Sequence, residues 1–192
     1  SNRVCILFQE KWSHNFTEKT KAICQEIQQK IYELMGIDVS MAIGSWVRKP
    51  EELVTSHNEA VETLLYRYLL GGRILIDREE QHFGQKADLE QSLLQLKDAV
   101  KYGEKERIKK TFLIIEEKIK QSLAEKSRAC MYLQQVIRSV DSACEEVSAD
   151  MNRIRAGREE LLRRITLQNS FQAACEIVKK HIDVIIENTF NT

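Results

Sequence analysis

Proline, glycine and an excess of charge of either sign are scarce in this sequence. One proline and seven glycines stand among 192 residues, which excludes a loop-rich chain and favours long helices. Lysine plus arginine number 29, as do aspartate plus glutamate, so no global charge attracts nucleic acid or an anionic membrane. With 43% hydrophobic residues, the chain still has enough apolar content to bury a core.

Cysteine pairs and long apolar runs are absent as well. The five cysteines are Cys5, Cys24, Cys130, Cys144 and Cys175. No two of them have the C-x-x-C spacing of a metal or redox pair, so we expect reduced, mostly buried thiols and a cytoplasmic protein. No apolar run reaches the roughly 18 residues that span a bilayer. We therefore expect no membrane contact by this chain.

The first part of the chain alternates between strand and helix patterns. The run from Val4 to Phe8 is almost wholly apolar, as in a strand that is covered on both faces. Apolar residues then recur at helical spacing between Phe16 and Leu34. We predict that Asn15 caps this helix and that Gly36 ends it.

A second strand, a second helix and a third strand follow. Period-two alternation over Ile37 to Val47 predicts a strand. Its small residues predict close packing on one face: Ser40, Ala42 and Gly44. Pro50 suits the first position of a helix that Gly71-Gly72 ends, and Arg73 to Asp77 has the composition of a strand. The pattern predicts a small sheet with helices packed against it.

Only helical patterns occur from Asp88 onward. We predict five helices, at roughly 88–101, 104–125, 127–149, 157–168 and 170–188. The predicted fold class is α+β, with a small α/β domain over residues 1–82 and an all-α helical bundle over 83–192. The second predicted helix carries an apolar stripe that is our candidate bundle core or dimer interface: Ile108, Phe112, Ile115 and Ile119.

Several positions of the first domain match a recurring pattern. They are Ile43-Gly44, Glu51-Glu52-Leu53, Ser56, Glu59-Ala60 and Leu65-Tyr66-Arg67. This pattern resembles the C-terminal half of the degenerate GGDEF-like domains in YesN-like, AraC-type bacterial regulators. The resemblance covers roughly residues 3 to 80. Residues 85–192 resemble the helical linker of the same proteins only in character and length.

The resemblance implies a non-catalytic region that transmits a signal and forms a homodimer within a two-component transcription regulator. Such a response regulator has a receiver or sensor domain upstream and a helix-turn-helix domain downstream. DNA contact is thus expected only through a C-terminal domain that is absent from this chain. The resemblance implies no cofactor.

No catalytic constellation stands out in the sequence. A diguanylate cyclase of the GGDEF fold needs a Gly-Gly-Asp/Glu-Glu-Phe turn and a metal-binding aspartate. Gly71-Gly72-Arg73 lacks the acids of that turn, so we predict no enzyme, and no catalytic, metal-binding or cofactor-binding residue. His57 lies on the apolar face of its predicted helix and is expected to be a core histidine.

Two other functions stay open. A ligand-binding sensor would keep a remnant nucleotide or metabolite pocket, lined by Ser40, Ser45 and Trp46. A helical protein–protein adaptor would instead dock its partner on residues 104–149. An arginine-rich stretch predicts either a local basic surface or an ordinary solvated helix face: Arg153, Arg155, Arg158, Arg163 and Arg164.

Overall fold

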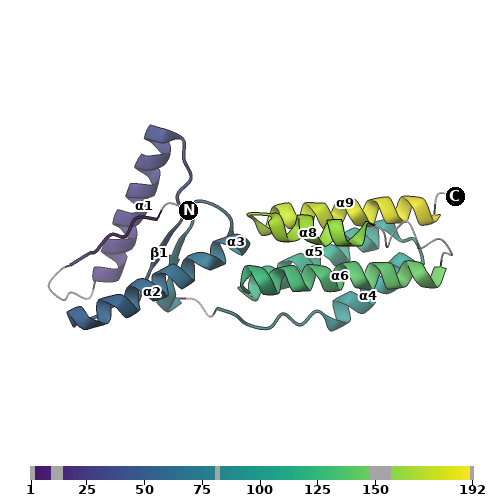
Figure 1. Cartoon of the computed structure of the whole chain (residues 1–192), viewed down its shortest axis with the longest axis horizontal. Helices are drawn as coiled ribbons and strands as arrows, with labels where there is room; N and C mark the ends of the chain where they lie inside the picture. Colours follow the sequence, from purple (N-terminus) through teal and green to yellow (C-terminus); the bar gives the residue numbers. More distant parts are fainter. Residues whose placement is uncertain (1–2, 10–14, 81–82, 148–156, 191–192) are drawn as a thin grey trace. The chain divides into compact units, whose positions relative to one another are not determined.

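The chain forms two compact units, Ser1–Gln81 and His82–Thr192, whose border lies one residue before the predicted one. The computed structural model describes residues 3–9, 15–80, 83–147 and 157–190. The fold is α+β, because the described chain is mostly helical and contains one small sheet of two parallel strands (Figure 1). Of the helices in these ranges, none combines the length and the apolar content needed to cross a bilayer.

The first unit, which we call the α/β unit, is built around this sheet. Its elements are α1 (Phe16–Met35), β1 (Met41–Ile43), the 3₁₀ turn η1 (Pro50–Glu52), α2 (Leu53–Thr63), the 3₁₀ turn η2 (Leu64–Tyr66), α3 (Arg67–Leu70), β2 (Leu75–Asp77) and the 3₁₀ turn η3 (Arg78–Glu80). Met41 lies opposite Leu75, and Ile43 lies opposite Asp77. In the ribbon, β1 lies between α1 and α2 (Figure 1).

Most predicted helix boundaries of this unit are confirmed. Gly36 ends α1 in the left-handed conformation, with φ of 65°, and its N–H donates to the Tyr32 carbonyl at 2.8 Å. Gly71 ends α3 with φ of 94°, and Pro50 begins η1. The predicted Asn15 cap is wrong: the Asn15 side chain makes no capping hydrogen bond. Its φ of −103° and ψ of 13° differ from the extended backbone that a capping side chain requires.

The predicted strand over Val4 to Phe8 is wrong. Residues 3–9 form no strand, and the side chains of Val4 and Leu7 are 87% and 66% exposed. An apolar run becomes a strand only where a neighbouring strand can take up its backbone hydrogen bonds. The predicted strand over Ile37 to Val47 is correct in place but shorter, because β2 offers partners only to residues 41–43.

Helix α1 holds both strands through one buried side chain. The Nε2 group of Gln28 donates to the carbonyl of Val39 at 2.8 Å and to that of Ile74 at 2.9 Å. These carbonyls stand at the amino ends of β1 and β2. At the other end of β2, Lys21 lies 3.2 Å from the buried Asp77 carboxylate. The helix therefore runs antiparallel to the two strands and is fastened at the amino ends of both and at the carboxyl end of β2.

Helix α2 packs closely on β1, as the small residues of that strand predicted. A Cβ atom placed on Gly44 would lie 2.0 Å from the carbonyl oxygen of Ser56. Only a glycine leaves room for the α2 backbone at this distance. Beside this contact, the Ser45 N–H donates to the Glu59 carboxylate at 3.1 Å.

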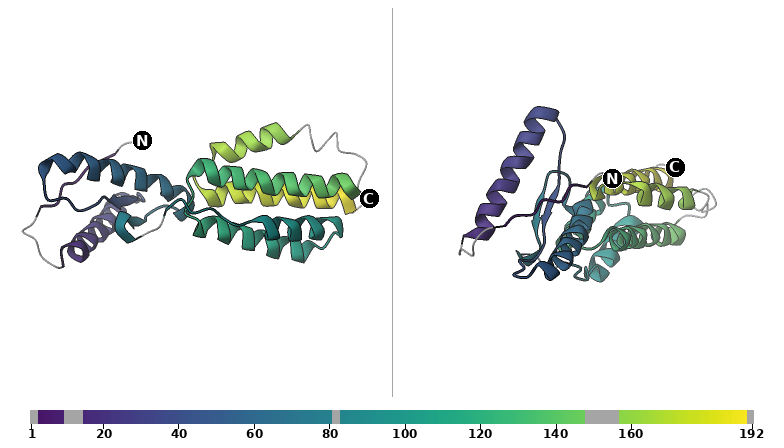
Figure 2. Two further views of the ribbon diagram at one scale, coloured as in Figure 1. Left: turned by 90° about the horizontal axis from the view of Figure 1, so that it is seen from below. Right: turned by 60° about the vertical axis from the view of Figure 1, so that its left-hand side comes forward.

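The second unit, which we call the helical unit, is a bundle. Its described helices are α4 (Glu90–Lys101), α5 (Lys105–Gln121), α6 (Lys126–Val147), α8 (Arg158–Leu167) and α9 (Phe171–Phe190). They lie side by side along a common direction (Figure 2), with α6 packed against both α4 and α9. Each of the five predicted helices has a counterpart, and α5 ends four residues earlier than predicted.

The two units differ in how much apolar surface they bury. In the described part of the α/β unit, four hydrophobic side chains are buried: Cys24, Tyr68, Leu69 and Ile76. The helical unit buries many more, among them Leu96, Val100, Leu133, Ile165, Phe171 and Val178. Burial of apolar side chains is the main favourable term in folding. The helical unit therefore has the larger core, whereas the α/β unit depends on its polar contacts and close packing.

Candidate functional site

The predicted stripe of α5 lies inside the bundle. Ile108 and Phe112 are 2% exposed, and Ile115 and Ile119 are fully buried. These values hold for the single chain, so the four side chains are covered by the chain's own helices. Of the two roles considered for the stripe, core and dimer contact, the structure places it in the bundle core.

A cluster of ionisable side chains brings together three helices of the bundle. Asp141 of α6 is 1% exposed. Its Oδ2 atom accepts a hydrogen bond from Nε of Arg158, on α8, at 2.8 Å and a second one from Nη2 of the same residue. Nε2 of His181, on α9, lies 3.8 Å from the Oδ1 atom. We call these three residues the Asp141 cluster.

The Asp141 cluster has the residue types of a catalytic site but the surroundings of a structural one. A two-bond contact between arginine and carboxylate fixes both groups in orientation and uses up one carboxylate oxygen. Oδ1 of Asp141 and Nε2 of His181 are buried, without a hydrogen-bond partner among the described residues. Because a substrate must reach the reacting atoms, we interpret the Asp141–Arg158 contact as a clamp that holds α8 to α6, with His181 of α9 beside it.

The sequence did not reveal this cluster, because its members lie 17 and 40 positions apart along the chain. One signal was available. Asp141 stands within the apolar stripe of its helix, next to Val140 and one turn before Cys144. A carboxylate on a buried helix face needs a cationic partner, so the position calls for an arginine, lysine or histidine from another helix.

A second buried carboxylate links α5 with α9. Glu116 is 5% exposed, and its oxygens lie 3.1 Å from Lys120 Nζ and 3.2 Å from Lys179 Nζ. Burial tends to lower the pKa of Lys179, but its hydrogen bonds to Glu176 and Glu116 outweigh that effect and raise it. Lys179 thus stays charged, and its Nζ lies 5.7 Å from the centre of the Phe112 ring.

The cysteines behave largely as predicted. No disulfide is present among the five thiols, and Cys24, Cys130, Cys144 and Cys175 are buried, whereas Cys5 is exposed. Burial raises the pKa of the Cys175 thiol, and the nearby Glu116 carboxylate raises it further. Since the thiolate is the reactive form, Cys175 is an inert core residue. Within the described ranges, no three His, Cys, Asp or Glu side chains gather as a metal site would require.

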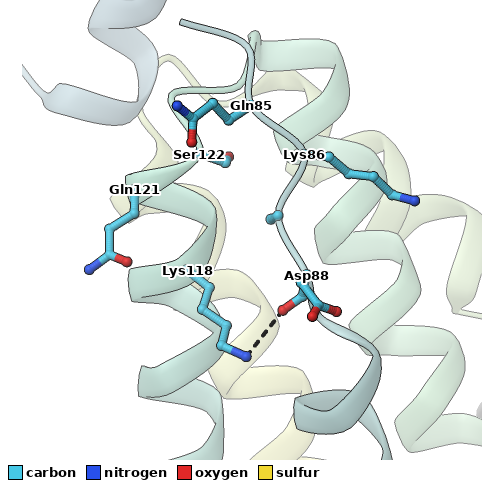
Figure 3. A pocket seen from close by; sticks show the side chains of 7 residues that line it. Gln85, Lys86, Asp88, Lys118, Gln121 and Ser122 are labelled. Atoms are coloured by element: carbon cyan, nitrogen blue, oxygen red, sulfur yellow. Dashed lines mark hydrogen bonds between the residues drawn. The ribbon is translucent and has the colours of Figure 1, made fainter. Parts of the chain in front are cut away.

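One polar hollow lies on the helical unit. It has a volume of about 370 Å³ and is lined by Gln85, Lys86, Ala87, Asp88, Lys118, Gln121 and Ser122. Figure 3 shows that Lys118 reaches toward Asp88, whereas the ends of Lys86 and Gln121 point away from the hollow. Ligand sites need polar groups that converge on one point. These groups do not converge, so we do not assign a ligand to the hollow.

The first residues of the helical unit are tied down along the bundle. We call residues 83–89 the strap. The Gly84 N–H donates to the Leu123 carbonyl at 2.9 Å, and Arg128 donates to the Gly84 carbonyl at 2.8 Å. The Ala87 N–H donates to the buried Tyr132 hydroxyl at 3.0 Å. The chain is thus fastened to the α5–α6 junction before α4 begins.

Lys118 holds the last part of the strap. Its Nζ atom donates to the Asp88 carbonyl at 3.1 Å and to the Ser92 hydroxyl at 3.0 Å. Leu123, which accepts the bond from Gly84, has φ of 43°, in the left-handed region that non-glycine residues seldom adopt. The strap is therefore fixed by several independent contacts, one of which depends on an unfavourable backbone conformation.

His57 and the arginine-rich stretch form no site in the described structure. His57 is exposed, so its assignment as a core histidine is wrong; α2 turns a neighbouring face toward β1. Of the predicted arginine-rich stretch, Arg158 is tied to Asp141 and Arg163 pairs with Glu160 at 2.7 Å, whereas Arg164 is exposed. Arg153 and Arg155 lie outside the described residues, as do His14 and His82.

Side-chain contacts occupy part of the place where the sequence predicted a remnant pocket, at Ser40, Ser45 and Trp46. Trp46 contacts the Phe16 ring, with 4.3 Å between ring centres. Its indole Nε1 is buried without a hydrogen-bond partner in the described structure. Ser40 and Ser45 are half-buried, and the Ser45 N–H is taken by Glu59.

We predict that the Asp141 cluster stabilises the bundle. Asp141→Leu removes the carboxylate that Arg158 needs; because the Arg158 side chain is 33% exposed and can turn to water, we expect a loss of about 2 kcal/mol of unfolding free energy. Urea denaturation followed by circular dichroism measures this loss.

The double variant Asp141→Leu, Arg158→Met should recover part of the lost unfolding free energy. The matched control Glu160→Gln, which removes an exposed pair on α8, should change the urea midpoint little. If Asp141→Leu and Glu160→Gln lowered the urea midpoint by equal amounts, the prediction would be contradicted.

No protein-family model, curated protein or solved structure matches this chain.

Proposed function

We propose that this chain is the non-catalytic, signal-transmitting and dimer-forming region of an AraC-type bacterial response regulator. The proposal starts from the sequence pattern that resembles the degenerate GGDEF-like domains of YesN-like proteins. The element order of the α/β unit, helix, strand, helix, strand, agrees with that resemblance from α1 onward.

The contacts among the pattern residues are the observation that carries the proposal. Gly44 meets the backbone of Ser56, and the Glu59 carboxylate accepts the N–H of Ser45, the residue after Gly44. Gly44, Ser56 and Glu59 all belong to the pattern. These three residues hold α2 on β1. A degenerate domain that has lost its catalytic residues is expected to keep such structural contacts.

The strap supplies a route for the signal. η3 ends at Glu80, and the chain is fastened to the α5–α6 junction from Gly84 onward. In this proposal the strap receives the signal, because its contacts tie it to the bundle helices. Phosphorylation or ligand binding upstream would change the packing between helical faces and so reorient a DNA-binding domain downstream.

The solution mass of the chain tests this proposal. Light scattering across a concentration series, with and without guanine nucleotides, should give a dimer whose mass and stability are indifferent to nucleotide. A monomer whose melting temperature rises with nucleotide would overturn the proposal, since a ligand that binds the native state stabilises it by mass action.

A ligand-binding sensor is the second candidate, and one observation favours it. Trp46 follows the carboxyl end of β1, and ligands of parallel sheets bind at that end. Its buried indole Nε1 has no hydrogen-bond partner among the described residues. The light-scattering series with guanine nucleotides distinguishes this candidate from the dimer-forming region proposed above.

A further inference from the structure

The sheet of the α/β unit has an open edge along β1. Within the described residues the sheet consists of β1 and β2 alone. The Met41 N–H donates to the Ile74 carbonyl, across to β2, at 2.8 Å. In a parallel ladder successive residues turn their backbone groups to opposite sides, so the N–H and C=O of Ala42 point away from β2. Such an edge is a template for an added strand.

The contacts of α1 show which of its sides faces which strand. Lys21 contacts Asp77 of β2, and Tyr32 packs under the guanidinium of Arg73, just before β2, at 4.3 Å. These two α1 residues are eleven positions apart and so point within about 20° of each other. On another side of the helix, Phe16 contacts Trp46, just after β1. The β2 side and the β1 side of α1 are thereby fixed.

An apolar stripe follows the β1 side of α1. Ile23, Ile27 and Leu34 follow Phe16 at intervals of seven, four and seven residues, so all four side chains point within about 40°. Ile23 is 43% exposed and Leu34 is 85% exposed. The stripe therefore extends past β1, over the place that the next strand of the sheet would occupy.

The same chain carries a segment suited to that place. Residues 4–8 have the apolar sequence of a strand buried on both faces, but they form no strand, and Val4, Ile6 and Leu7 are 87%, 49% and 66% exposed. An exposed apolar segment and an uncovered apolar face are each unfavourable in water. Each would be covered by the other.

We propose that residues 4–8 of a second copy of this chain add to the free edge of β1, in a reciprocal dimer. In a two-fold exchange, residues 4–8 of each copy pair with the β1 edge of the other copy, so that neither segment and neither edge stays unpaired. The net charge of +0 means that the copies do not repel each other. A stable interface buries roughly 800 Å² per partner, and the added strand and the α1 stripe of each copy both contribute apolar surface toward that area. This inference rests on the dimer-forming part of the proposed function.

A disulfide experiment tests the contact directly. Ser40→Cys places a thiol directly before β1, and the exposed Cys5 lies in the added segment. We expect mild oxidation to give a disulfide-linked dimer on a non-reducing gel. Adding Cys5→Ser should remove it, and the control Val54→Cys, 68% exposed on α2, should give no enrichment. A disulfide between the new thiol and Cys5 within one chain would overturn the proposal.

Solution mass gives a second readout that needs no oxidation. Ile6→Lys and Ala42→Pro should each weaken dimerisation at least tenfold, with an unchanged helical signal, because proline is tolerated where its missing N–H faces a free edge. Leu94→Lys, at a 60% exposed site of the helical unit, is the matched control and should leave the mass unchanged. A dimer that resists both variants would overturn this inference but keep the proposed function. A nucleotide-stabilised monomer would overturn both.

Discussion

Replacing Ile115 with aspartate is expected to abolish the folded helical unit. Ile115 is fully buried in the middle of α5, and it lies one position from Glu116, whose two lysine partners are already in use. A new carboxylate at this position has no cation to pair with. Burying it costs more than about 4 kcal/mol, a large share of the stability of a typical domain.

Leu113→Asp is the matched control on the same helix. Leu113 is 56% exposed, so an aspartate there stays in water and should change the unfolding free energy by no more than about 0.5 kcal/mol. Urea denaturation followed by the helical circular dichroism signal compares the two variants, since both introduce the same charged side chain into the same helix. Similar midpoints for both would show that the α5 stripe is not core.

Gly44→Ala should detach α2 from β1. The added methyl group would lie 2.0 Å from the Ser56 carbonyl oxygen and 2.8 Å from the Ser56 carbonyl carbon. These are backbone atoms of a helix, so the helix as a whole must move, which we expect to cost about 3 kcal/mol. Because the α/β unit has a small core, a loss of this size should open it while the helical unit stays folded.

Amide hydrogen exchange resolved by peptide measures this effect unit by unit. Peptides from α2 and β1 should lose protection in Gly44→Ala, and peptides from α5 and α6 should keep it. Gly72→Ala provides the control, because the nearest atom to its added methyl group would be Asp38 Cβ, at 3.9 Å. Unchanged protection of α2 in Gly44→Ala would refute the close packing.

Local signals in the sequence were sufficient to predict most of the helices. Gly36 and Gly71 end helices because their positive φ angles suit glycine, and Pro50 begins one because its missing N–H is not needed there. The five helices of the bundle follow from apolar spacing in the same way. These signals act within a few residues, so the sequence alone expresses them.

The failures share a different cause. The segment 4–8 has the composition of a strand, but a strand also needs an edge to pair with, and that edge is not specified by its own residues. His57 was placed by periodicity on a buried face, yet α2 is fixed by the Gly44–Ser56 contact, which turns His57 outward. The Asp141 cluster joins residues from three helices, and only tertiary packing brings them together.

The two hydrogen bonds that Gln28 donates determine how the α/β unit responds to mechanical force. Tension applied along the axis of β2 would load the contacts that α1 makes with this strand. The hydrogen bond from Gln28 to Ile74 and the ion pair of Lys21 with Asp77 would then be sheared together rather than broken one after another. Gln28 also holds Val39, ahead of β1, so β1 shares the load. A pull on β2 should therefore carry α1 and β1 along as one rigid body.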